Sequence, residues 1–484
     1  MVTRALTIRA SVAIIALAYA TFVYLHGSPF AAGSDSSGYL NSARLLARGE
    51  LTTSARTLPG LTPPEWRYHW QEPLGFTASH LTPRMAPTYS TGLPLHLLLV
   101  APIVGWEKAA RAVNVLNVLA AAALLYALAR ELTLSRAWSL VAVALLWASP
   151  LFLYNSLQPL SDALALTWAV AAILCALKSR ERLPWAFAAG AAFAVAVLVR
   201  PTNLLLALPL LFALGVSWRA WLATVVGGLP GAIWLFIVNS HAFGSPFKTG
   251  YGDLTNTFEF RFLVGNLAHF TLWVPLLVSV PVALAALALP WFRRGAPIPS
   301  TLPLLASWFG VFAVFYATYY CAGDLWSDVR FLLPGFPAVI LAGLLAVRSW
   351  RPTPPWLLLG CCLVGQFFLA SELRVTGIRE QERAYRVATR WLEAHVAPGS
   401  VVIVAQLSGA AQFYNELVLV RWDALPPHHL ETLRLAAARS SRTIYAALFN
   451  PEIEAAQKAL PSARWQLVDQ TPGVKFFRLL PASP

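Results

Sequence analysis

Apolar residues are gathered along this chain into runs of about 20 residues, the length that an α-helix needs to cross a bilayer core. Short polar connections separate the runs. The pattern predicts about eleven membrane spans, at residues 7–26, 111–129, 138–153, 161–177, 184–199, 203–217, 220–239, 267–291, 302–321, 331–348 and 355–371. We therefore expect a mainly α-helical, polytopic transmembrane bundle in residues 1–371.

Basic residues fall on alternate connections, and this bias predicts the orientation of the spans. If the N-terminus is cytoplasmic, the inside connections carry Arg130, Arg136, Lys178, Arg180, Arg182, Arg219, Arg293, Arg294, Arg348 and Arg351. Cytoplasmic loops of membrane proteins are enriched in Lys and Arg. A large first loop, residues 27–88, and a second loop, residues 240–266, are then expected on the outer side.

The segment from Tyr89 to Gly105 is apolar but short, and Pro94 and Pro102 interrupt it. We interpret it as an interfacial or re-entrant helix. The alternative is an ordinary second span, which would turn every later basic connection to the outside. The charge bias favours the interfacial helix.

Residues 372–484 differ from the rest in their polar, alternating composition, which predicts a small α/β domain on the outer side. We expect helices at Gln381–His395, His428–Ala438 and Glu452–Leu460. Strands are expected at Val401–Ala405, Leu417–Val420 and Thr443–Leu448, and residues 473–480 close the domain.

Composition narrows the class of protein. The chain is 57% hydrophobic and 12% charged, and its net charge of +14 would suit nucleic acid. However, the basic residues lie at the ends of apolar runs, where they orient spans, so no nucleic-acid partner is expected. The four cysteines show neither a disulfide framework nor a metal-site spacing. We interpret residues 7–26 as a retained span rather than a signal peptide, although Ala31-Ala32-Gly33 is similar to a cleavage site.

Asp35 is the first candidate for chemistry. It lies just after the first span in Gly33-Ser34-Asp35-Ser36, ahead of a helical stretch that ends at Gly49. A carboxylate at the membrane boundary can take a proton from an acceptor hydroxyl. Alternatively, Asp35 caps the helix that follows, and both roles are compatible.

Cations on the predicted outer side are the second candidate. Arg200, Lys248, Arg261 and Arg330 run against the orientation bias. Arg and Lys bind phosphate well, and Arg does so with two parallel hydrogen bonds. The alternatives are snorkelling to lipid head groups or pairing with Asp324 and Asp328. Asp162 follows Ser161 at the start of a span and is expected to be a helix cap.

Aromatic and polar residues of the first loop suit a sugar ring. Trp66, His69 and Glu72 lie there. An interfacial aromatic belt is the alternative for Trp66 and its neighbours. His69 and His80 lack the carboxylate or Cys spacing that would support a metal site, so no metal is expected.

Four short motifs together resemble the GT-C superfamily of polytopic membrane glycosyltransferases. Asp35 with Tyr39 and Ala43 resembles its acidic first-loop motif. Tyr89-Ser90-Thr91-Gly92-Leu93-Pro94 resembles the start of its second juxtamembrane helix. The remaining two are Val199-Arg200-Pro201-Thr202 and Arg330-Phe331-Leu332-Leu333-Pro334. The chain is similar in particular to bacterial protein O-mannosyltransferases and lipid A aminoarabinose transferases.

This resemblance implies a polyprenyl-phosphate-linked sugar as donor and inverting transfer to a glycan, lipid or protein acceptor at the outer face of the bacterial cytoplasmic membrane. Asp35 would be the general base, and Arg200, Arg330, Lys248 and Arg261 would bind the donor phosphate. Sugar and acceptor would meet Tyr39, Trp66, His69, Glu72 and Tyr89. Many family members have a second acid after the first, where this chain has Ser36, so we expect a single-base mechanism without a metal or cofactor.

Two other classes of function stay open at this point. A lipid-linked sugar transporter or flippase would have charges or broken helices near the middle of the membrane, and most predicted spans lack ionisable residues there. A non-catalytic scaffold for cell-envelope assembly would use residues 372–484 as its binding module.

Overall fold

The computed structural model describes residues 2–59, 61, 69–81, 83–290, 301–320, 325–350 and 354–480. The described chain forms two compact units. The first comprises Met1–Gly27, Lys108–Trp234 and Asp253–Ile378, and the second comprises Ser28–Glu107, Leu235–Gly252 and Arg379–Pro484. Residues 28–88 of the first predicted loop and the polar tail from Arg379 onward are therefore parts of the same unit. The predicted domain boundary at residues 371 and 372 stays a prediction.

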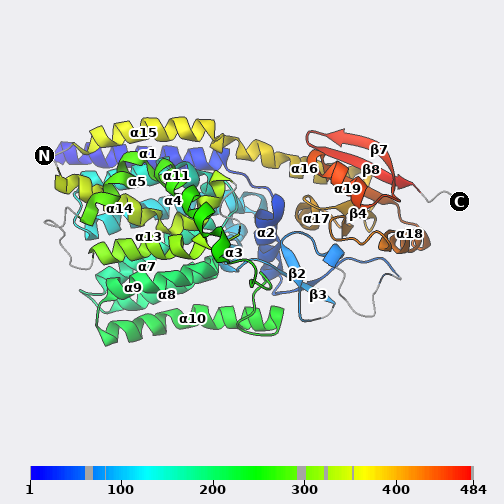
Figure 1. The fold of residues 1–484 in the computed structure, drawn as a ribbon, viewed down its shortest axis with the longest axis horizontal. Coiled ribbons are helices and arrows are strands. Elements are labelled where there is room, and N and C mark those ends of the chain that lie inside the picture. The colour runs from blue at the N-terminus through cyan, green and yellow to red at the C-terminus, as the bar shows by residue number, and fades with distance from the viewer. Residues whose placement is uncertain are drawn as a thin grey trace. The chain divides into compact units, whose positions relative to one another are not determined.

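The first unit is helical. Its elements, some of which continue into the second unit, are α1 (Val2–His26), α4 (Trp106–Glu131), α5 (Arg136–Ala148), α6 (Pro150–Ser156), α7 (Asp162–Lys178), α8 (Pro184–Val199), η2 (Pro201–Leu206), α9 (Ala207–Leu214), α10 (Trp218–Phe243), η3 (Phe260–Phe262), α11 (Leu263–Val278), α12 (Val280–Ala288), α13 (Thr301–Ala317), η5 (Trp326–Gly335), α14 (Phe336–Trp350) and α15 (Pro355–Glu372). Each predicted span coincides with one helix or with two consecutive helices. Figure 1 shows α5, α7, α13, α14 and α15 running in nearly the same direction.

The predicted polytopic helical fold is confirmed. Among the described residues, five helical segments are long and apolar enough to span a membrane, and the bent pair α5 and α6 makes a sixth if it counts as one span. Shorter apolar helices lie at Ala10–His26, Gly92–Val104, Pro184–Val199, Pro201–Leu214 and Thr301–Ala317. The exact number of spans stays a prediction.

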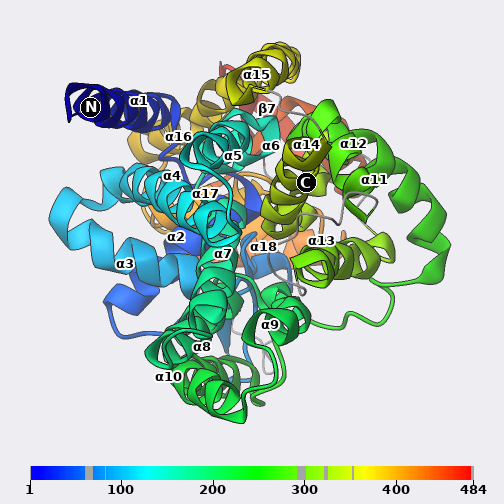
Figure 2. The same ribbon diagram turned by 90° about the vertical axis from the view of Figure 1, so that its left-hand side faces the viewer.

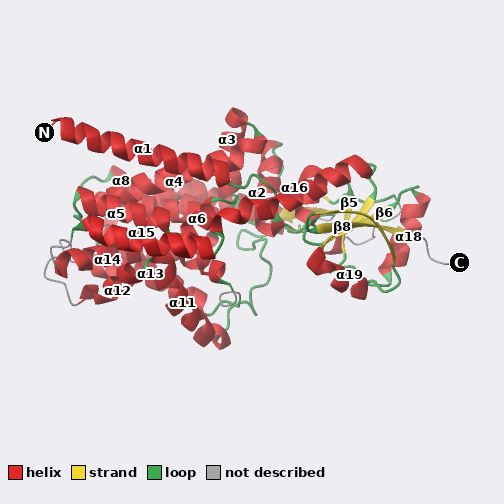
Figure 3. Cartoon of the chain, turned by 90° about the horizontal axis from the view of Figure 1, so that it is seen from above, coloured by secondary structure: helices red, strands yellow, loops and turns green. Residues whose placement is uncertain are grey.

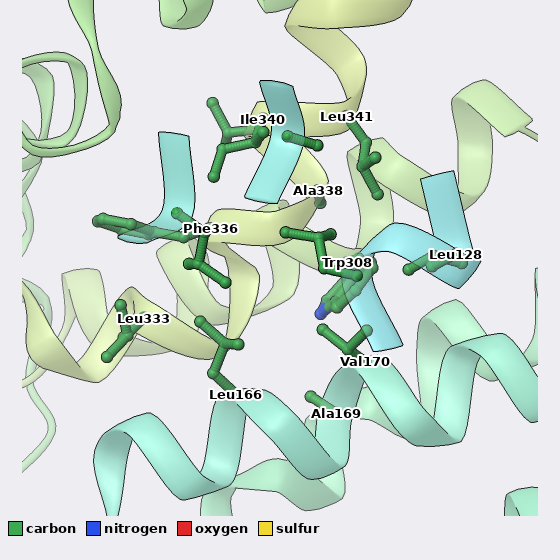
Figure 4. Packing of buried hydrophobic residues seen from close by; sticks show 14 of the residues in the cluster. Leu128, Leu166, Ala169, Val170, Trp308, Leu333, Phe336, Ala338, Ile340 and Leu341 are labelled. Carbon is green, nitrogen blue, oxygen red and sulfur yellow. The ribbon is translucent and has the colours of Figure 1, made fainter. Parts of the chain in front are cut away.

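The core of the first unit is built around α7, which is buried along almost its whole length. In Figure 2, which looks along the helices, α4, α5, α8, α9 and α13 surround α7. Figure 4 shows the side chain of Trp308 lying among Leu128, Val170 and Ala338, and Trp308 is fully buried. A helix that is apolar on all sides is buried on all sides, which explains why α7 occupies the centre.

Residues from the predicted cytoplasmic connections contact one another at one end of this unit. Lys178 Nζ lies 3.8 Å from Glu131 Oε2, and Arg348 donates a hydrogen bond to the carbonyl oxygen of Thr133. Asp162, by contrast, begins the 17-residue helix that Lys178 ends. The two residues are therefore separated by about 25 Å along α7. Lys178 and Arg348 come from connections that were predicted to lie on the same side of the membrane, and their contacts at one end of the unit agree with that prediction. The side that each end faces stays a prediction.

The second unit starts with α2 (Gly33–Ala47), which is followed by a small sheet. Strands β1 (Thr53–Ser54), β2 (Phe76–Ala78) and β3 (Arg84–Pro87) form this antiparallel sheet in the order β1-β3-β2, and η1 (His69–Gln71) precedes β2. Helix α3 (Gly92–Val104) then follows, with Leu99 72% and Ile103 82% exposed. Its 13 residues extend about 20 Å, less than the hydrocarbon core of about 30 Å. The length suits the predicted interfacial helix.

The tail of the chain folds as the predicted α/β domain (Figure 3). Its elements are α16 (Ile378–His395), β4 (Val401–Val404), α17 (Ser408–Tyr414), β5 (Val418–Arg421), α18 (His429–Arg439), β6 (Ile444–Phe449), η7 (Asn450–Glu452), α19 (Ile453–Ala459), β7 (Arg464–Thr471) and β8 (Val474–Leu480). The strand order is β5-β4-β6-β8-β7. Strands β4, β5 and β6 are parallel, whereas β7 and β8 are antiparallel.

The elements predicted for the tail are present, within a few residues of their predicted bounds, and three further elements, α17, η7 and β7, were not predicted. Helix α17 has seven residues, among them Gly409 and two alanines, which give little periodic signal. Strand β7 lies at the edge of the sheet and is mostly exposed, so its sequence lacks the apolar alternation of a half-buried strand.

A buried carboxyl lies in α16. Glu382 is 8% exposed, and it hydrogen-bonds to the side chain of Ser28. Its other oxygen, Oε2, has no hydrogen-bond partner among the described residues. Burial raises the pKa of Glu382 from 4.5 to about 7. This carboxyl is therefore neutral in the folded protein at a pH where it is charged in the unfolded chain.

The stability of the protein should consequently fall as the pH rises from about 4.5 to about 7. The full cost above pH 7 is about 3 kcal/mol for this shift. We expect Glu382→Gln to melt at a higher temperature than the wild type at pH 8 and to lose that advantage at pH 4.5. Melting in detergent at both pH values measures this.

Glu380→Gln is the matched control, because Glu380 lies on the same helix with 77% of its side chain exposed. It should change the melting temperature little at either pH. Equal effects of the two substitutions would show that burial of Glu382 does not carry the pH dependence.

Candidate active site

Asp35 lies inside the first turn of α2, as its third residue, and does not cap the helix. The N-cap position belongs to Ala32, which has extended backbone angles and makes no side-chain capping bond. The capping role that we considered for Asp35 is therefore wrong. A carboxylate in a first turn is favoured by the partial positive charge at the helix N-terminus.

The phenol of Tyr89 is the partner of this carboxylate. Tyr89 Oη lies 2.7 Å from Ser34 Oγ and also hydrogen-bonds to the Asp35 side chain. Burial and, after it, the negative charge of Asp35 raise the pKa of Tyr89 well above its ordinary value. The phenol therefore stays protonated, donates to the carboxylate and accepts a hydrogen bond from Ser34.

Two glycines allow Tyr89 to approach α2 so closely. A Cβ on Gly38 would lie 2.6 Å from Cδ2 of Tyr89. Gly75 has φ +88°, and a Cβ there would lie 2.6 Å from the Cα of Gly38. The amide of Thr88 donates to the carbonyl oxygen of Gly75 over 2.9 Å, which ties the segment before Tyr89 to the same place. Larger residues at these two glycines would displace the phenol from Asp35.

Among the described residues, two aromatic rings lie beside the phenol of Tyr89. The ring of Tyr39 lies 5.2 Å from that of Tyr89, and the ring of Tyr251 lies 6.1 Å away in an edge-on arrangement. The structure thus brings Asp35, Tyr39 and Tyr89 together, and their roles toward sugar and acceptor stay predictions. Tyr251 was not selected from the sequence, although its position between Gly250 and Gly252, in a loop predicted to lie on the outer side, is the signal that marks it.

His69 and Glu72 form a pair of their own at η1. His69 Nδ1 lies 3.3 Å from Glu72 Oε1. Burial raises the pKa of Glu72, and the nearby His69 and Arg421 oppose this shift. Since Glu72 also hydrogen-bonds to the backbone of Ala78, the pair joins η1 to strand β2. Trp66, the third predicted sugar-binding residue of this loop, lies outside the described residues.

In the first unit, Asp162 joins two of the predicted phosphate-binding arginines. The carboxylate is buried, with 3% of the side chain exposed, and it accepts a hydrogen bond from Arg200. Its second oxygen lies 3.9 Å from Nη1 of Arg330. Ser161 is the N-cap of α7 and Asp162 is its first residue, so the expectation that Asp162 caps this helix was wrong. One buried carboxylate is thus shared by two guanidinium groups.

An aromatic ring supports both guanidinium groups. Cζ of Arg200 lies 4.9 Å and Cζ of Arg330 lies 5.4 Å from the ring centroid of Phe331. Tyr316 stacks on the same ring at 5.0 Å and donates a hydrogen bond to Thr202 Oγ1 over 2.8 Å. These contacts hold the cations in a fixed arrangement.

The local sequence explains the position of Arg200. A residue before proline is disfavoured in the α region, and Pro201 follows Arg200. Helix α8 therefore ends at Val199, and Arg200 is extended with φ −149° and ψ 113°. The predicted Arg-Pro junction is thus a break between α8 and η2.

The other two predicted cations are exposed. Arg261 Nη2 lies 2.7 Å from Glu259 Oε1, and 66% of the Arg261 side chain is exposed. Lys248 is exposed in the loop that follows α10, which belongs to the second unit. Their roles toward phosphate stay predictions. Among the described residues, no three His, Cys, Asp or Glu side chains are grouped closely enough to bind a metal ion.

Comparisons with known proteins identify the fold. Residues 94–243 match the family model described as dolichyl-phosphate-mannose-protein mannosyltransferase. The structure is similar to that of ArnT from Cupriavidus metallidurans in the apo state, with a TM-score of 0.63 and 14% sequence identity, covering 99% of this chain and 98% of ArnT. ArnT bound to undecaprenyl phosphate matches with a TM-score of 0.59 and 14% identity, covering 97% of this chain and 98% of ArnT.

The arabinofuranosyltransferase AftD from Mycobacteria also matches, with a TM-score of 0.59 and 13% identity, covering 97% of this chain and 40% of AftD. No curated protein sequence matches this chain. The chain therefore has the fold of the GT-C membrane glycosyltransferases, which confirms the resemblance drawn from its motifs.

The buried ion cluster generates a prediction about stability. Asp162→Asn should destabilise the protein by about 3–5 kcal/mol, because it leaves two guanidinium groups without their shared carboxylate. Thermal melting in detergent, with tryptophan fluorescence as the signal, measures the loss.

The control is Glu259→Gln, which breaks the exposed pair with Arg261 and should cost less than about 1 kcal/mol. If Asp162→Asn melts at the wild-type temperature, the cluster is not the buried ion pair described above.

Proposed function

We propose that this protein is an integral membrane glycosyltransferase that moves a sugar from a polyprenyl-phosphate donor to an acceptor at the outer face of the bacterial cytoplasmic membrane. The observation that carries the proposal is the agreement in fold over 99% of this chain and 98% of ArnT. One of the similar ArnT structures is bound to undecaprenyl phosphate. A lipid phosphate of this kind suits a bundle of apolar helices with arginines at one end.

Asp35 is the proposed general base. Its carboxylate takes the proton of an acceptor hydroxyl while the hydroxyl oxygen attacks the anomeric carbon of the donor sugar. The bond between this carbon and the phosphate oxygen breaks, the electron pair leaves with the phosphate, and the configuration inverts. Because Tyr89 donates to Asp35, the carboxylate is held in place before the acceptor arrives.

Arg200 and Arg330 are proposed to bind the donor phosphate. Fixed guanidinium groups stabilise the negative charge that develops on a departing phosphate, and such preorganised charge is a large term in catalysis. Asp162 holds both guanidinium groups at one place, since it pairs with Arg200 and lies 3.9 Å from Nη1 of Arg330. Lys248 and Arg261 are weaker candidates for this role because both are exposed.

We propose that the sugar and the acceptor contact Tyr39 and Tyr89, with Trp66, His69 and Glu72 as further candidates. Loops 27–87 and 240–266 would close over the sugar and exclude water. A single base without a metal ion or cofactor is proposed because Ser36, and not a second acid, follows Asp35. The acceptor is a glycan, a lipid or a protein.

A substitution tests the base. Asp35→Asn should lower sugar transfer at least about 100-fold, the usual contribution of a general base, while the melting temperature stays close to that of the wild type. The assay uses purified protein in lipid vesicles with a panel of polyprenyl-phosphate sugars and detects products by mass spectrometry.

Glu259→Gln serves again as the control, since it removes a carboxylate that the proposed mechanism does not use. Wild-type turnover by Asp35→Asn would remove Asp35 from the mechanism.

A second substitution tests the phosphate site. Arg330→Ala should raise the KM for the donor about tenfold or more and change the KM for the acceptor little. A charge-assisted hydrogen bond contributes about 1.5–3 kcal/mol, and 1.4 kcal/mol corresponds to a factor of ten.

Arg136→Ala is the comparison, because it removes an exposed arginine of the same unit that has no proposed role toward phosphate. Equal donor kinetics for wild type and Arg330→Ala would contradict a phosphate role for Arg330.

A further inference from the structure

The tail contains the arrangement in which open α/β sheets bind ligands. Its parallel strands have the order β5-β4-β6, so the chain leaves β4 toward β5 and then crosses to β6 on the other side of β4. Ligands of such sheets bind beyond the carboxyl ends of the strands, at the point where the strand order reverses. In this domain, that point lies between the ends of β4 and β6.

A carboxylate of the tail, that of Glu452, blocks the space at the ends of β4 and β6. Glu452, which follows β6, accepts hydrogen bonds over 3.0 Å from the backbone amides of Gln406 and Phe449. The indole nitrogen of Trp422 lies 3.4 Å from the same carboxylate. The loops after β4, β5 and β6 are therefore tied together around one buried acid, Glu452, which is 9% exposed.

The first outer loop packs beside this closed end. Helix α17 starts at Ser408 just after β4, and its Ser408 Oγ accepts a hydrogen bond from the amide of Leu74 over 2.9 Å. Gly409 approaches so closely that an added Cβ would meet Ser37 Oγ and would lie 2.7 Å from the carbonyl oxygen of Leu74. The tail thus contacts α2 with the end of its sheet. In an isolated α/β domain, this end would face solvent or a ligand.

Contacts along α2 continue from this point. Asn41 Nδ2 donates to the carbonyl oxygen of Gly409 over 3.1 Å. Arg44 Nη1 donates to the carbonyl oxygen of Phe413 over 2.6 Å, and Cζ of Arg44 lies 3.4 Å from the centroid of the Phe413 ring. Residues 37, 41 and 44 recur with the period of an α-helix, so one face of α2 meets the tail.

Asp35 lies on a different face of the same helix. At 100° per residue, positions 37, 41 and 44 point roughly 180–240° away from position 35 around the axis. The tail also holds the start of α2, because the amide of Ala31 donates to Tyr414 Oη over 3.3 Å and the backbone of Gly33 hydrogen-bonds to Tyr385. The helix that carries Asp35 is therefore fixed from behind and at its first turn.

We propose that α17 is a positioning element for Asp35 and that Gly409 and Phe413 set the place of α2 in the active site. The role of the tail is then to act on its own first loop, in place of binding a small molecule at its strand ends. This inference rests on the proposed function, since Asp35 is positioned for sugar transfer. Displacing a catalytic group by about 1 Å can cost 100-fold in rate.

Gly409→Ala in the full-length protein tests this inference. We expect kcat for sugar transfer to fall 10- to 100-fold, while the KM for the polyprenyl-phosphate sugar changes less than twofold. Hydrogen exchange of α2 amides, which does not depend on activity, should become at least tenfold faster. Gln412→Ala, on the same helix but at a half-buried position, is the matched control and should leave both readouts unchanged.

Two substitutions of Arg44 test the same inference without adding a larger side chain. Arg44→Gln should lower kcat and loosen α2 in the same way, and Arg44→Lys should restore part of both because an ammonium keeps a positive charge near the Phe413 ring as well as a donor for the carbonyl. Wild-type kcat and wild-type exchange of α2 in both Gly409→Ala and Arg44→Gln would overturn the inference. An equal loss of kcat from Gln412→Ala would do the same.

The wild-type assay separates this inference from the proposed function. If the wild type transfers no sugar from any donor of the panel, the proposed function fails, while the exchange data still report whether α17 holds α2. If the wild type is active and Gly409→Ala turns over normally, the positioning role fails and the proposed function stands.

Discussion

The sidedness of the helices is the constraint on which the proposed chemistry depends. A carboxylate and guanidinium groups serve one reaction only if they face the same side of the membrane, and the basic connections are what orient the spans. In the first unit, Lys178 contacts Glu131 at the end of α7, while Asp162 and Arg200 meet at its start. The same helix therefore separates Lys178, in a connection predicted to be cytoplasmic, from the arginines proposed to bind phosphate.

The carboxylate of Asp35 depends on contacts from two directions. Tyr89 donates to it from a segment that Gly38 and Gly75 allow to come close. From the opposite face, α17 holds α2 through Phe413 and its neighbours. A base is effective when it is held where the proton will be, before the substrate binds. These contacts hold the short helix that carries the proposed base on two sides.

Much of the fold follows from local patterns. Each span predicted from a long apolar run forms one helix or two consecutive helices. The alternation of apolar and polar residues predicted the three parallel strands of the tail. Helix α17 was missed because a seven-residue stretch of small side chains has no period that can be recognised. Its importance comes from the close approach of Gly409 to α2, and this contact joins residues more than 300 positions apart.

The candidate site could also be predicted in part, because several of its residues lie in short local motifs. Asp35, Tyr39 and Tyr89 lie together, and so do Arg200 and Arg330. The sequence near Asp162 looks like a helix cap, because Ser-Asp before an apolar run has that pattern whether or not an arginine faces it. Only tertiary structure decides which carboxylate meets Arg200. Likewise, Tyr251 lies beside Tyr89 through a contact between two segments that are far apart in the sequence.

Labelling of single cysteines from one side of the membrane tests the central claim most directly. In a variant without native cysteines, Arg48→Cys at the end of α2 and Leu325→Cys before η5 should both react with a membrane-impermeant maleimide on intact cells. Arg182→Cys, after α7, should react only after permeabilisation. All three positions are exposed in the structure. Reaction of residues 48 and 325 from opposite sides would contradict the account, because Asp35 and Arg330 could not then share one substrate.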